Sequence, residues 1–192
     1  MYPDLRARLR ASLDSSPATP TVAPGDRMAA VLAPLAETPE PALVFTLRSS
    51  GLSRHAGEIS FPGGLQDPGE SLVETALREA HEEIGLDPAL PDVLGALPPV
   101  HTTVSGILVV PFVGLLAELP AFTPSDREIE RVLVFPIARL AAVESEVEYE
   151  LGGGSSWRGW VYEADGETVW GATGRMLHDL LEVVREEASW LL

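Results

Sequence analysis

Residues 64–86 read GLQDPGESLVETALREAHEEIGL and place six acidic side chains in a loop followed by a helical pattern. Three of the acids, Glu79, Glu82 and Glu83, have the i, i+3, i+4 spacing that brings side chains together on one side of a helix. Like charges at this spacing repel one another, and no Lys or Arg at the same spacing lies on that edge to neutralise them. The segment therefore predicts a binding site for a hard divalent metal ion.

The helix in this segment is expected to begin near Pro68 or Gly69 and to end at Gly85. Asp67 and Glu70, three residues apart, resemble a capping box, with Pro68 at the first helical position. Gly85 suits the left-handed residue that commonly ends a helix.

A helical wheel separates the two sides of this helix. The apolar arc, which is expected to face the core, contains Leu72, Val73, Ala76, Leu77, Ala80 and Ile84. Glu79 and Glu83 lie at the edge of this arc, with Glu82 just outside them. The far side carries Glu74, Arg78 and His81. The carboxylates thus border the packed face, where a cleft is expected.

Immediately before this segment, residues 61–64 read FPGG. Gly63 and Gly64 allow the backbone to turn tightly, to approach a ligand and to leave a carbonyl free for a metal ion. Taken alone, the pattern fits a plain turn equally well. Its position directly ahead of the acidic helix favours the metal site.

The composition fits a single domain of a soluble enzyme. The chain has 192 residues, a hydrophobic content of 45% and a formal net charge of −16, which argues against nucleic acid as a partner. All 13 basic side chains are arginines, which either reflects a compositional bias or suits phosphate binding. There is no cysteine, no signal-peptide pattern and no apolar stretch of membrane-spanning length, so we expect a cytoplasmic protein without membrane partners.

The predicted organisation is an N-terminal extension with a Pro-rich connector over residues 1–25 and one mixed α/β domain over residues 26–192. A short amphipathic helix is expected within residues 1–14, and a second helix, capped by Asp26, is expected to pass through Met28 and Leu35. The strand candidates are residues 42–48, 93–97, 104–116, 131–135, 146–151, 157–163 and 167–170. Residues 175–188 form a closing amphipathic helix, and residues 152–156, GGGSS, form a hairpin tip or lid.

The acidic segment resembles the Nudix box, G-x5-E-x7-R-E-U-x-E-E-x-G-U, where U is aliphatic. The matching residues are Gly64, Glu70, Arg78, Glu79, Ala80, Glu82, Glu83, Gly85 and Leu86. The resemblance implies a Nudix-type α/β/α sandwich with a mixed β-sheet between helices. It also implies Mg²⁺- or Mn²⁺-dependent hydrolysis of a nucleoside diphosphate derivative.

Carried over to this chain, the resemblance implies a role for each residue. Glu79 and Glu83 would be primary metal ligands and Glu82 a further one, assisted by the carbonyl of Gly63 or Gly64. Glu70 and Arg78 would pair to brace the loop against the helix.

Residues 43–64, LVFTLRSSGLSRHAGEISFPGG, are similar to the signature that precedes the box in coenzyme A pyrophosphatases, roughly L-L-T-x-R-[SA]-x3-R-x3-G-x3-F-P-G-G. Its second arginine falls on Ser53 here, with Arg54 beside it. The substrate-binding residues implied are Arg48, Arg54, His55, Gly63 and Gly64. Residues 128–140 and 169–177 also resemble this subfamily, and we interpret Trp170 as a core residue.

The resemblance implies cleavage of coenzyme A (CoA) or a derivative into 4′-phosphopantetheine and 3′,5′-ADP. The alternatives are hydrolysis of ADP-ribose, NADH or another nucleoside diphosphate derivative, and a non-catalytic nucleotide-sensing module. An arginine is expected to bind the 3′-phosphate of CoA. For this role we favour Arg48 and Arg54 over Arg127 and Arg131. The general base stays open: the candidates are Glu79, Glu82, Glu128, Glu144, Glu146, His55, His81 and His101.

Overall fold

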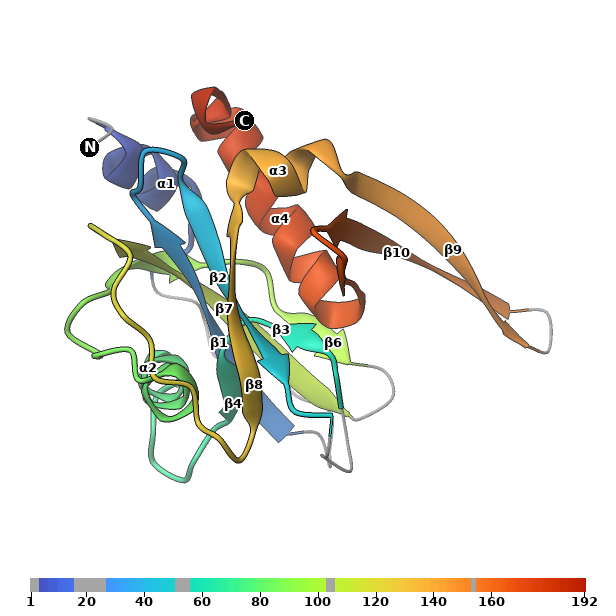
Figure 1. Ribbon diagram of the computed structural model, residues 1–192, viewed down its shortest axis with the longest axis horizontal. Coiled ribbons are helices and arrows are strands. Elements are labelled where there is room, and N and C mark those ends of the chain that lie inside the picture. Colours follow the sequence, from blue (N-terminus) through green and yellow to red (C-terminus); the bar gives the residue numbers. More distant parts are fainter. Residues whose placement is uncertain (1–3, 16–26, 51–55, 103–105, 153–154) are drawn as a thin grey trace.

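A mixed β-sheet lies between helices that cover both of its faces (Figure 1). The computed structural model describes residues 4–15, 27–50, 56–102, 106–152 and 155–192. Within these residues the sheet has the strand order β3-β2-β1-β7-β5, with β4 paired to β1, β6 to β7 and β8 to β2. The strands are β1 (Arg27–Ala36), β2 (Ala42–Arg48), β3 (Ile59–Ser60), β4 (Gly63–Leu65), β5 (Asp92–Ala96), β6 (Val100–Thr102), β7 (Ile107–Leu116) and β8 (Ile129–Pro136).

The sheet is mixed because β1 and β7 run parallel, from the pair Arg27↔Ile107 to the pair Ala36↔Leu116. The other strand pairings of this sheet in the described residues are antiparallel. The predicted fold class, an α/β/α sandwich around a mixed sheet, is therefore confirmed.

Helix α2 (Leu72–Ile84) covers one face of the sheet. Its residues Ala76, Ala80 and Ile84 are fully buried, and they pack in one cluster with sheet residues such as Leu32 and Val44. Leu72, Val73 and Leu77 are partly buried against the same cluster. The apolar arc predicted for this helix is thus the arc that faces the core.

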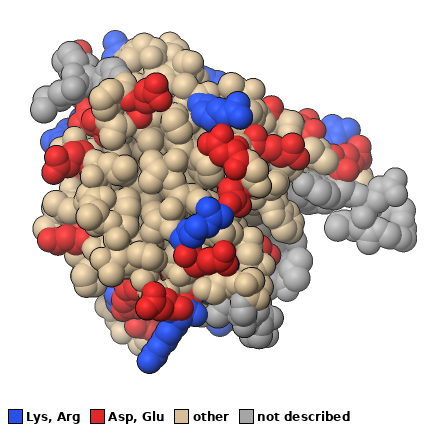
Figure 2. Space-filling model, in the orientation of Figure 1, with Lys and Arg blue, Asp and Glu red and all other residues tan. Residues whose placement is uncertain are grey.

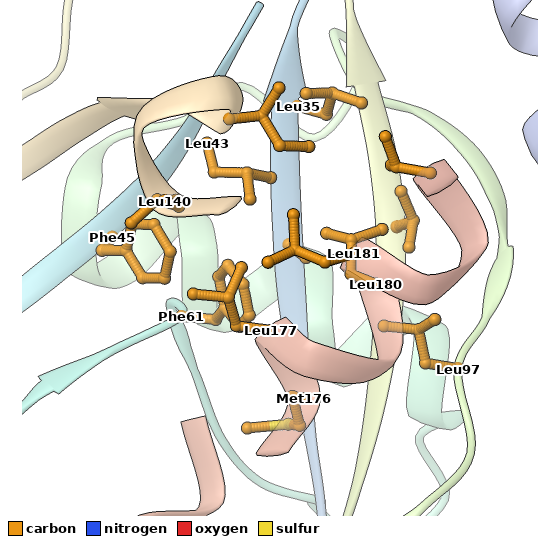
Figure 3. Packing of buried hydrophobic residues seen from close by; sticks show 14 of the residues in the cluster. Leu35, Leu43, Phe45, Phe61, Leu97, Leu140, Met176, Leu177, Leu180 and Leu181 are labelled. Atoms are coloured by element: carbon orange, nitrogen blue, oxygen red, sulfur yellow. The ribbon is translucent and has the colours of Figure 1, made fainter. Parts of the chain in front are cut away.

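The opposite face is covered by α4 (Gly171–Glu187), together with α1 (Leu5–Ser12) and α3 (Ile137–Ala142). In Figure 3, Leu177, Leu180 and Leu181 of α4 lie in one cluster with Phe61 and with Leu35 and Leu43 of the sheet. Leu5 and Leu9 of α1 are fully buried in this same cluster. The N-terminal helix expected from the sequence is therefore packed into the core. A short 3-10 helix, η1 (Ser189–Leu191), follows α4.

The helix predicted to run through Met28 and Leu35 is wrong, because these residues form strand β1. This strand lies inside the sheet, so it is buried on both faces: Ala30 and Leu32 join the α2 cluster, while Val31 joins the α4 cluster. A strand buried on both faces is apolar throughout and lacks the alternation that distinguishes a strand from a buried helix.

A second, three-stranded sheet has the order β11-β10-β9 in the described residues: β9 (Glu144–Gly152), β10 (Ser155–Ala164) and β11 (Glu167–Val169). The hairpin of β9 and β10 projects from the body of the protein, away from α2 (Figure 1). Residues 153–154 of the predicted hairpin tip lie outside the described residues, as does most of the Pro-rich connector. The rest of the tip forms the end of β9 and the start of β10. No helix in the described ranges is long and apolar enough to cross a membrane.

Candidate active site

Helix α2 begins later than the sequence predicts. Ser71 is the N-cap: the Glu74 N–H donates to its hydroxyl, and the Glu74 carboxylate accepts the Ser71 N–H at 2.8 Å. Asp67 and Glu70 do make a contact, at 3.2 Å from the Asp67 N–H, but it lies in the preceding loop. Gly69 has φ of 87°, so a helix cannot pass through it. At the other end Gly85 has the predicted left-handed conformation, with φ of 69°.

Arg78 holds the loop before α2 against the helix. Its Nε and Nη2 donate to the two carboxylate oxygens of Glu70 at 2.9 and 3.1 Å, and Nη2 also donates to the Leu65 carbonyl at 3.1 Å. The Thr75 hydroxyl donates to the same carboxylate at 2.7 Å. The Arg78 hydrogen bonds are the main reason that the pKa of Glu70 is lowered to about 2, so Glu70 stays charged.

Arg78 also reaches two of the three clustered carboxylates. Its Nη1 lies 2.7 Å from Glu79 Oε1 and 3.3 Å from Glu82 Oε2. The sequence argument that this edge has no cation is therefore wrong. The helical wheel places the Arg78 backbone on the far side, but the side chain is long enough to extend around the helix.

Glu79 lies directly against the backbone of strand β4. A Cβ atom added to Gly64 would be 2.5 Å from Glu79 Cδ, so only glycine fits there beside this carboxylate. Burial raises the pKa of Glu79 above its ordinary value, although Arg78 acts in the opposite direction.

Glu83 is the most deeply buried member of the cluster, with 4% of its surface exposed. The Gly63 N–H donates to Oε2 and Arg48 Nη1 donates to Oε1, both at 3.2 Å. Burial raises the pKa of Glu83 to about 7 despite these two donors. By contrast, the Glu82 side chain is 58% exposed.

Arg48, at the end of β2, connects Glu83 with a carboxylate from another loop. Its Nη2 lies 3.6 Å from Glu128 Oε2, while its buried Nε has no hydrogen-bond partner within the described residues. Glu128 is held in place by its backbone, because its carbonyl accepts the Ser49 N–H at 2.8 Å. The Ser125 N–H donates to the Glu83 carbonyl at 2.8 Å, which joins the same loop to α2. Glu128 therefore faces the buried end of the cluster.

The profile of the Nudix domain matches residues 26–153. A protein from Pectobacterium atrosepticum named uncharacterized Nudix hydrolase NudL is 38% identical over 159 residues, which cover 80% of this chain and 81% of that protein. A NudL from Photorhabdus laumondii is 33% identical and covers 92% of this chain and 95% of its own length. The chain belongs to the Nudix family.

Solved structures agree with this assignment at the level of the fold. The Nudix domain of Shewanella oneidensis NrtR, solved with ADP ribose, has a TM-score of 0.56 and 17% identity, and covers 97% of this chain and 98% of its own. A MutT/nudix family protein from Enterococcus faecalis has a TM-score of 0.55 and 14% identity, and covers 88% of this chain and 66% of its own.

Nudix hydrolases act on nucleoside diphosphate derivatives and generally use divalent metal ions. In the described part of the chain, no three acidic or histidine side chains converge closely enough to form a metal shell as they stand. Glu79 and Glu82 instead share Arg78, and Glu83 is paired with Arg48. The donor set nevertheless suits a hard cation, because it consists of carboxylate oxygens and burial disfavours the charge on two of them.

Glu144 and Glu146, two of the residues considered as the general base, lie away from the Nudix box. Glu144 accepts hydrogen bonds from Tyr162 at 2.6 Å and from Arg185, and its Oε1 lies 3.0 Å from His178 Nδ1. Burial acts to raise the pKa of Glu144, but these partners hold it below its ordinary value. In this structure Glu144 is therefore engaged by residues of β10 and α4 rather than by the Nudix box. Glu146 is an exposed residue of the projecting hairpin.

His178 is not among the candidates that the sequence suggested, and its ring stacks on Trp160 with the centroids 3.8 Å apart. His81 is exposed with Nδ1 3.2 Å from the Leu86 carbonyl, and His101 is an exposed residue of β6. Trp170 is 47% exposed, so its interpretation as a core residue is wrong. The candidates Arg54 and His55 lie outside the described residues.

Proposed function

We propose that this Nudix protein is a cytoplasmic enzyme that hydrolyses the pyrophosphate bond of CoA or a CoA derivative, giving 4′-phosphopantetheine and 3′,5′-ADP. The observation that carries the proposal is the contact between Arg48 and Glu83. Arg48 belongs to the segment that resembles the CoA pyrophosphatase signature, and Glu83 belongs to the Nudix box. Within the described part of this segment, Arg48 and the Gly63 N–H both contact Glu83, which supports a role of the segment in substrate binding.

The ion in this proposal is Mg²⁺ or Mn²⁺, held by Glu79, Glu82 and Glu83 with the Gly64 carbonyl. When bound, it would neutralise charge on the pyrophosphate and lower the pKa of the attacking water. Arg48 pairs with Glu83 and Arg78 pairs with Glu79 and Glu82, which holds these carboxylates in place. The two arginines offset part of the cost that burial places on the charges of Glu79 and Glu83. The Glu70 carboxylate fixes Arg78 and through it the position of Glu79.

The proton acceptor in this proposal is one of the site carboxylates. Glu82 and Glu128 have side chains that are 58% and 54% exposed, so a water molecule can reach them. Glu79 is mostly buried against Gly64, which makes it better suited to holding an ion. The general base can be assigned by comparing pH–rate profiles for Glu82→Gln and Glu128→Gln. The variant that lacks the base should lose the fall in rate at low pH, because that fall reflects protonation of the base.

The substrate is tested by comparing turnover of CoA, ADP-ribose and NADH at one fixed Mn²⁺ concentration, with the products identified by mass. We expect CoA to have the highest kcat/KM and to give 4′-phosphopantetheine and 3′,5′-ADP. Equal or faster turnover of ADP-ribose would contradict the CoA assignment and leave the Nudix chemistry intact.

The Glu83→Gln variant tests whether the box is catalytic. Removal of a buried metal ligand is expected to lower kcat on CoA at least a hundredfold. Unchanged turnover would show that Glu83 is not a ligand. If the parent protein binds CoA without cleaving it, the protein is a sensing module rather than an enzyme.

A further inference from the structure

Most of the positive charge in this protein is already neutralised. The net charge is −16, and on the face shown in Figure 2 the basic side chains lie beside acidic ones. Among the described residues, nine arginines form ion pairs with Asp or Glu side chains. They are Arg6, Arg10, Arg48, Arg78, Arg131, Arg139, Arg158, Arg175 and Arg185. Arg8 lies over the Trp190 ring and donates to the Glu187 carbonyl.

The two remaining arginines in the described ranges, Arg27 and Arg127, have no guanidinium partner there. Arg27 begins strand β1. Arg127 is exposed and directly precedes Glu128, whose carboxylate faces Arg48. An unpaired arginine beside the active site is available for an anion, because it has no carboxylate to release first.

The backbone fixes Arg127 with respect to the candidate metal ligands. On one side, the Ser125 N–H donates to the Glu83 carbonyl at 2.8 Å, and Ser125 in turn accepts the Ile129 N–H at 2.9 Å. On the other side, the Glu128 carbonyl accepts the Ser49 N–H at 2.8 Å. Arg127 therefore lies on a turn connected both to α2 and to the end of β2.

Two of the other arginines considered for an additional phosphate, Arg48 and Arg131, are less available. Arg48 is paired with Glu83 and Glu128, and Arg131 is paired with Glu167. The ion pairs of Arg48 thus favour Arg127 over Arg48 for this role.

We propose that Arg127 binds a phosphate group of the substrate that lies outside the scissile pyrophosphate. This inference rests on the proposed function, in which that group is the 3′-phosphate of the CoA ribose. Arg127 is then a specificity-determining residue: it contributes to binding of substrates that carry the extra phosphate and nothing to those that lack it.

The test compares CoA with 3′-dephospho-CoA in the parent enzyme and in Arg127→Gln and Arg127→Lys. Arg158→Gln is the matched control, because it removes one exposed positive charge from the projecting hairpin. We expect Arg127→Gln to lower kcat/KM for CoA about tenfold and that for dephospho-CoA less than twofold, and Arg127→Lys to retain part of the preference. Equal losses on both substrates, no loss on either, or the same pattern in Arg158→Gln would overturn the proposal.

A binding measurement keeps this test independent of turnover. If neither substrate is hydrolysed, the proposed function fails, and calorimetry with 3′,5′-ADP and 5′-AMP in the presence of Mn²⁺ still decides the role of Arg127. The parent protein should bind 3′,5′-ADP about tenfold more tightly than 5′-AMP, and Arg127→Gln should lose this preference. No preference in the parent protein, or an unchanged one in the variant, would contradict the inference.

Discussion

Arg48 Nη1 lies 3.2 Å from Glu83 Oε1, and this ion pair joins the end of strand β2 to the last turn of helix α2. The Glu83 side chain is 6% exposed and that of Arg48 is 23% exposed. A carboxylate at this depth is costly to charge, and the arginine offsets only part of the cost. We therefore expect this pair to influence how the stability of the protein and its affinity for metal ions depend on pH.

The pKa of about 7 for Glu83 predicts that the metal-free protein becomes less stable as the pH rises from about 4.5 to 7. The folded state binds this proton more tightly than the unfolded state, so the stabilisation is complete below the unfolded pKa and is lost as the pH passes through the folded pKa. The loss is on the order of 2–3 kcal/mol.

Urea unfolding in EDTA between pH 5 and 8 measures this effect. Glu83→Gln should remove the decline, whereas Glu163→Gln, at an exposed position on β10, should retain it. Parallel curves for the parent protein and Glu83→Gln would be inconsistent with a raised pKa. Since Glu83 must be ionised to bind a cation, Mn²⁺ affinity should also rise with pH up to about 7.

Gly64→Ala is expected to impair metal binding rather than folding. The new methyl group would lie 2.5 Å from Glu79 Cδ, so the carboxylate must move away from strand β4. We expect a loss in kcat of about a hundredfold, comparable with the loss of a catalytic electrostatic contact, and a weaker Mn²⁺ affinity by calorimetry.

Gly69→Ala is the matched control for this loop. Gly69 has φ of 87° but no neighbour within 4 Å of an added Cβ. Alanine there should cost about 1 kcal/mol of stability through backbone strain and leave Mn²⁺ affinity unchanged. If both variants bind Mn²⁺ like the parent, the contact between Gly64 and Glu79 does not matter for the metal.

The sequence predicts the buried face and the end of helix α2 well, although not its start, because helical spacing alone determines which residues share a side. The burial of Ala76, Ala80 and Ile84 and the left-handed Gly85 follow from local rules. Local rules fail for strand β1, whose burial on both faces depends on neighbours that are distant in the sequence.

The ion pairs of the site were less predictable for the same reason. The contact of Arg48 with Glu83 spans 35 residues, and the position of Glu128 depends on loop hydrogen bonds to α2 and β2. Spacing identified Glu79, Glu82 and Glu83 as a group. It could not show that Arg78 lies between two of them, since this depends on the conformation of a long side chain.

Glu70→Gln should weaken the contact between the loop and α2. Because the pKa of Glu70 is lowered to about 2, its charge stabilises the protein above pH 4.5, and this contribution is lost as the pH falls through 2. We expect a loss of about 1 kcal/mol at pH 7, since the group is partly exposed. Urea unfolding at pH 7 and pH 4 measures the difference in free energy of unfolding between the parent protein and Glu70→Gln. This difference should be smaller at pH 4. A pH-independent difference would mean that the contact with Arg78 does not depend on the Glu70 charge.

Tyr162→Phe tests whether the Glu144 cluster is separate from the active site. The Tyr162 hydroxyl is 2.6 Å from Glu144 Oε1, and Tyr162, on β10, is fully buried. Loss of the hydroxyl should lower the free energy of unfolding by about 1–2 kcal/mol. The effect is limited because Glu144 keeps its contacts with His178 and Arg185. Turnover of CoA and Mn²⁺ affinity should not change, since Glu144 is held by α4 on the opposite face of the sheet from α2. A tenfold fall in kcat with Mn²⁺ affinity intact would instead connect this cluster to catalysis.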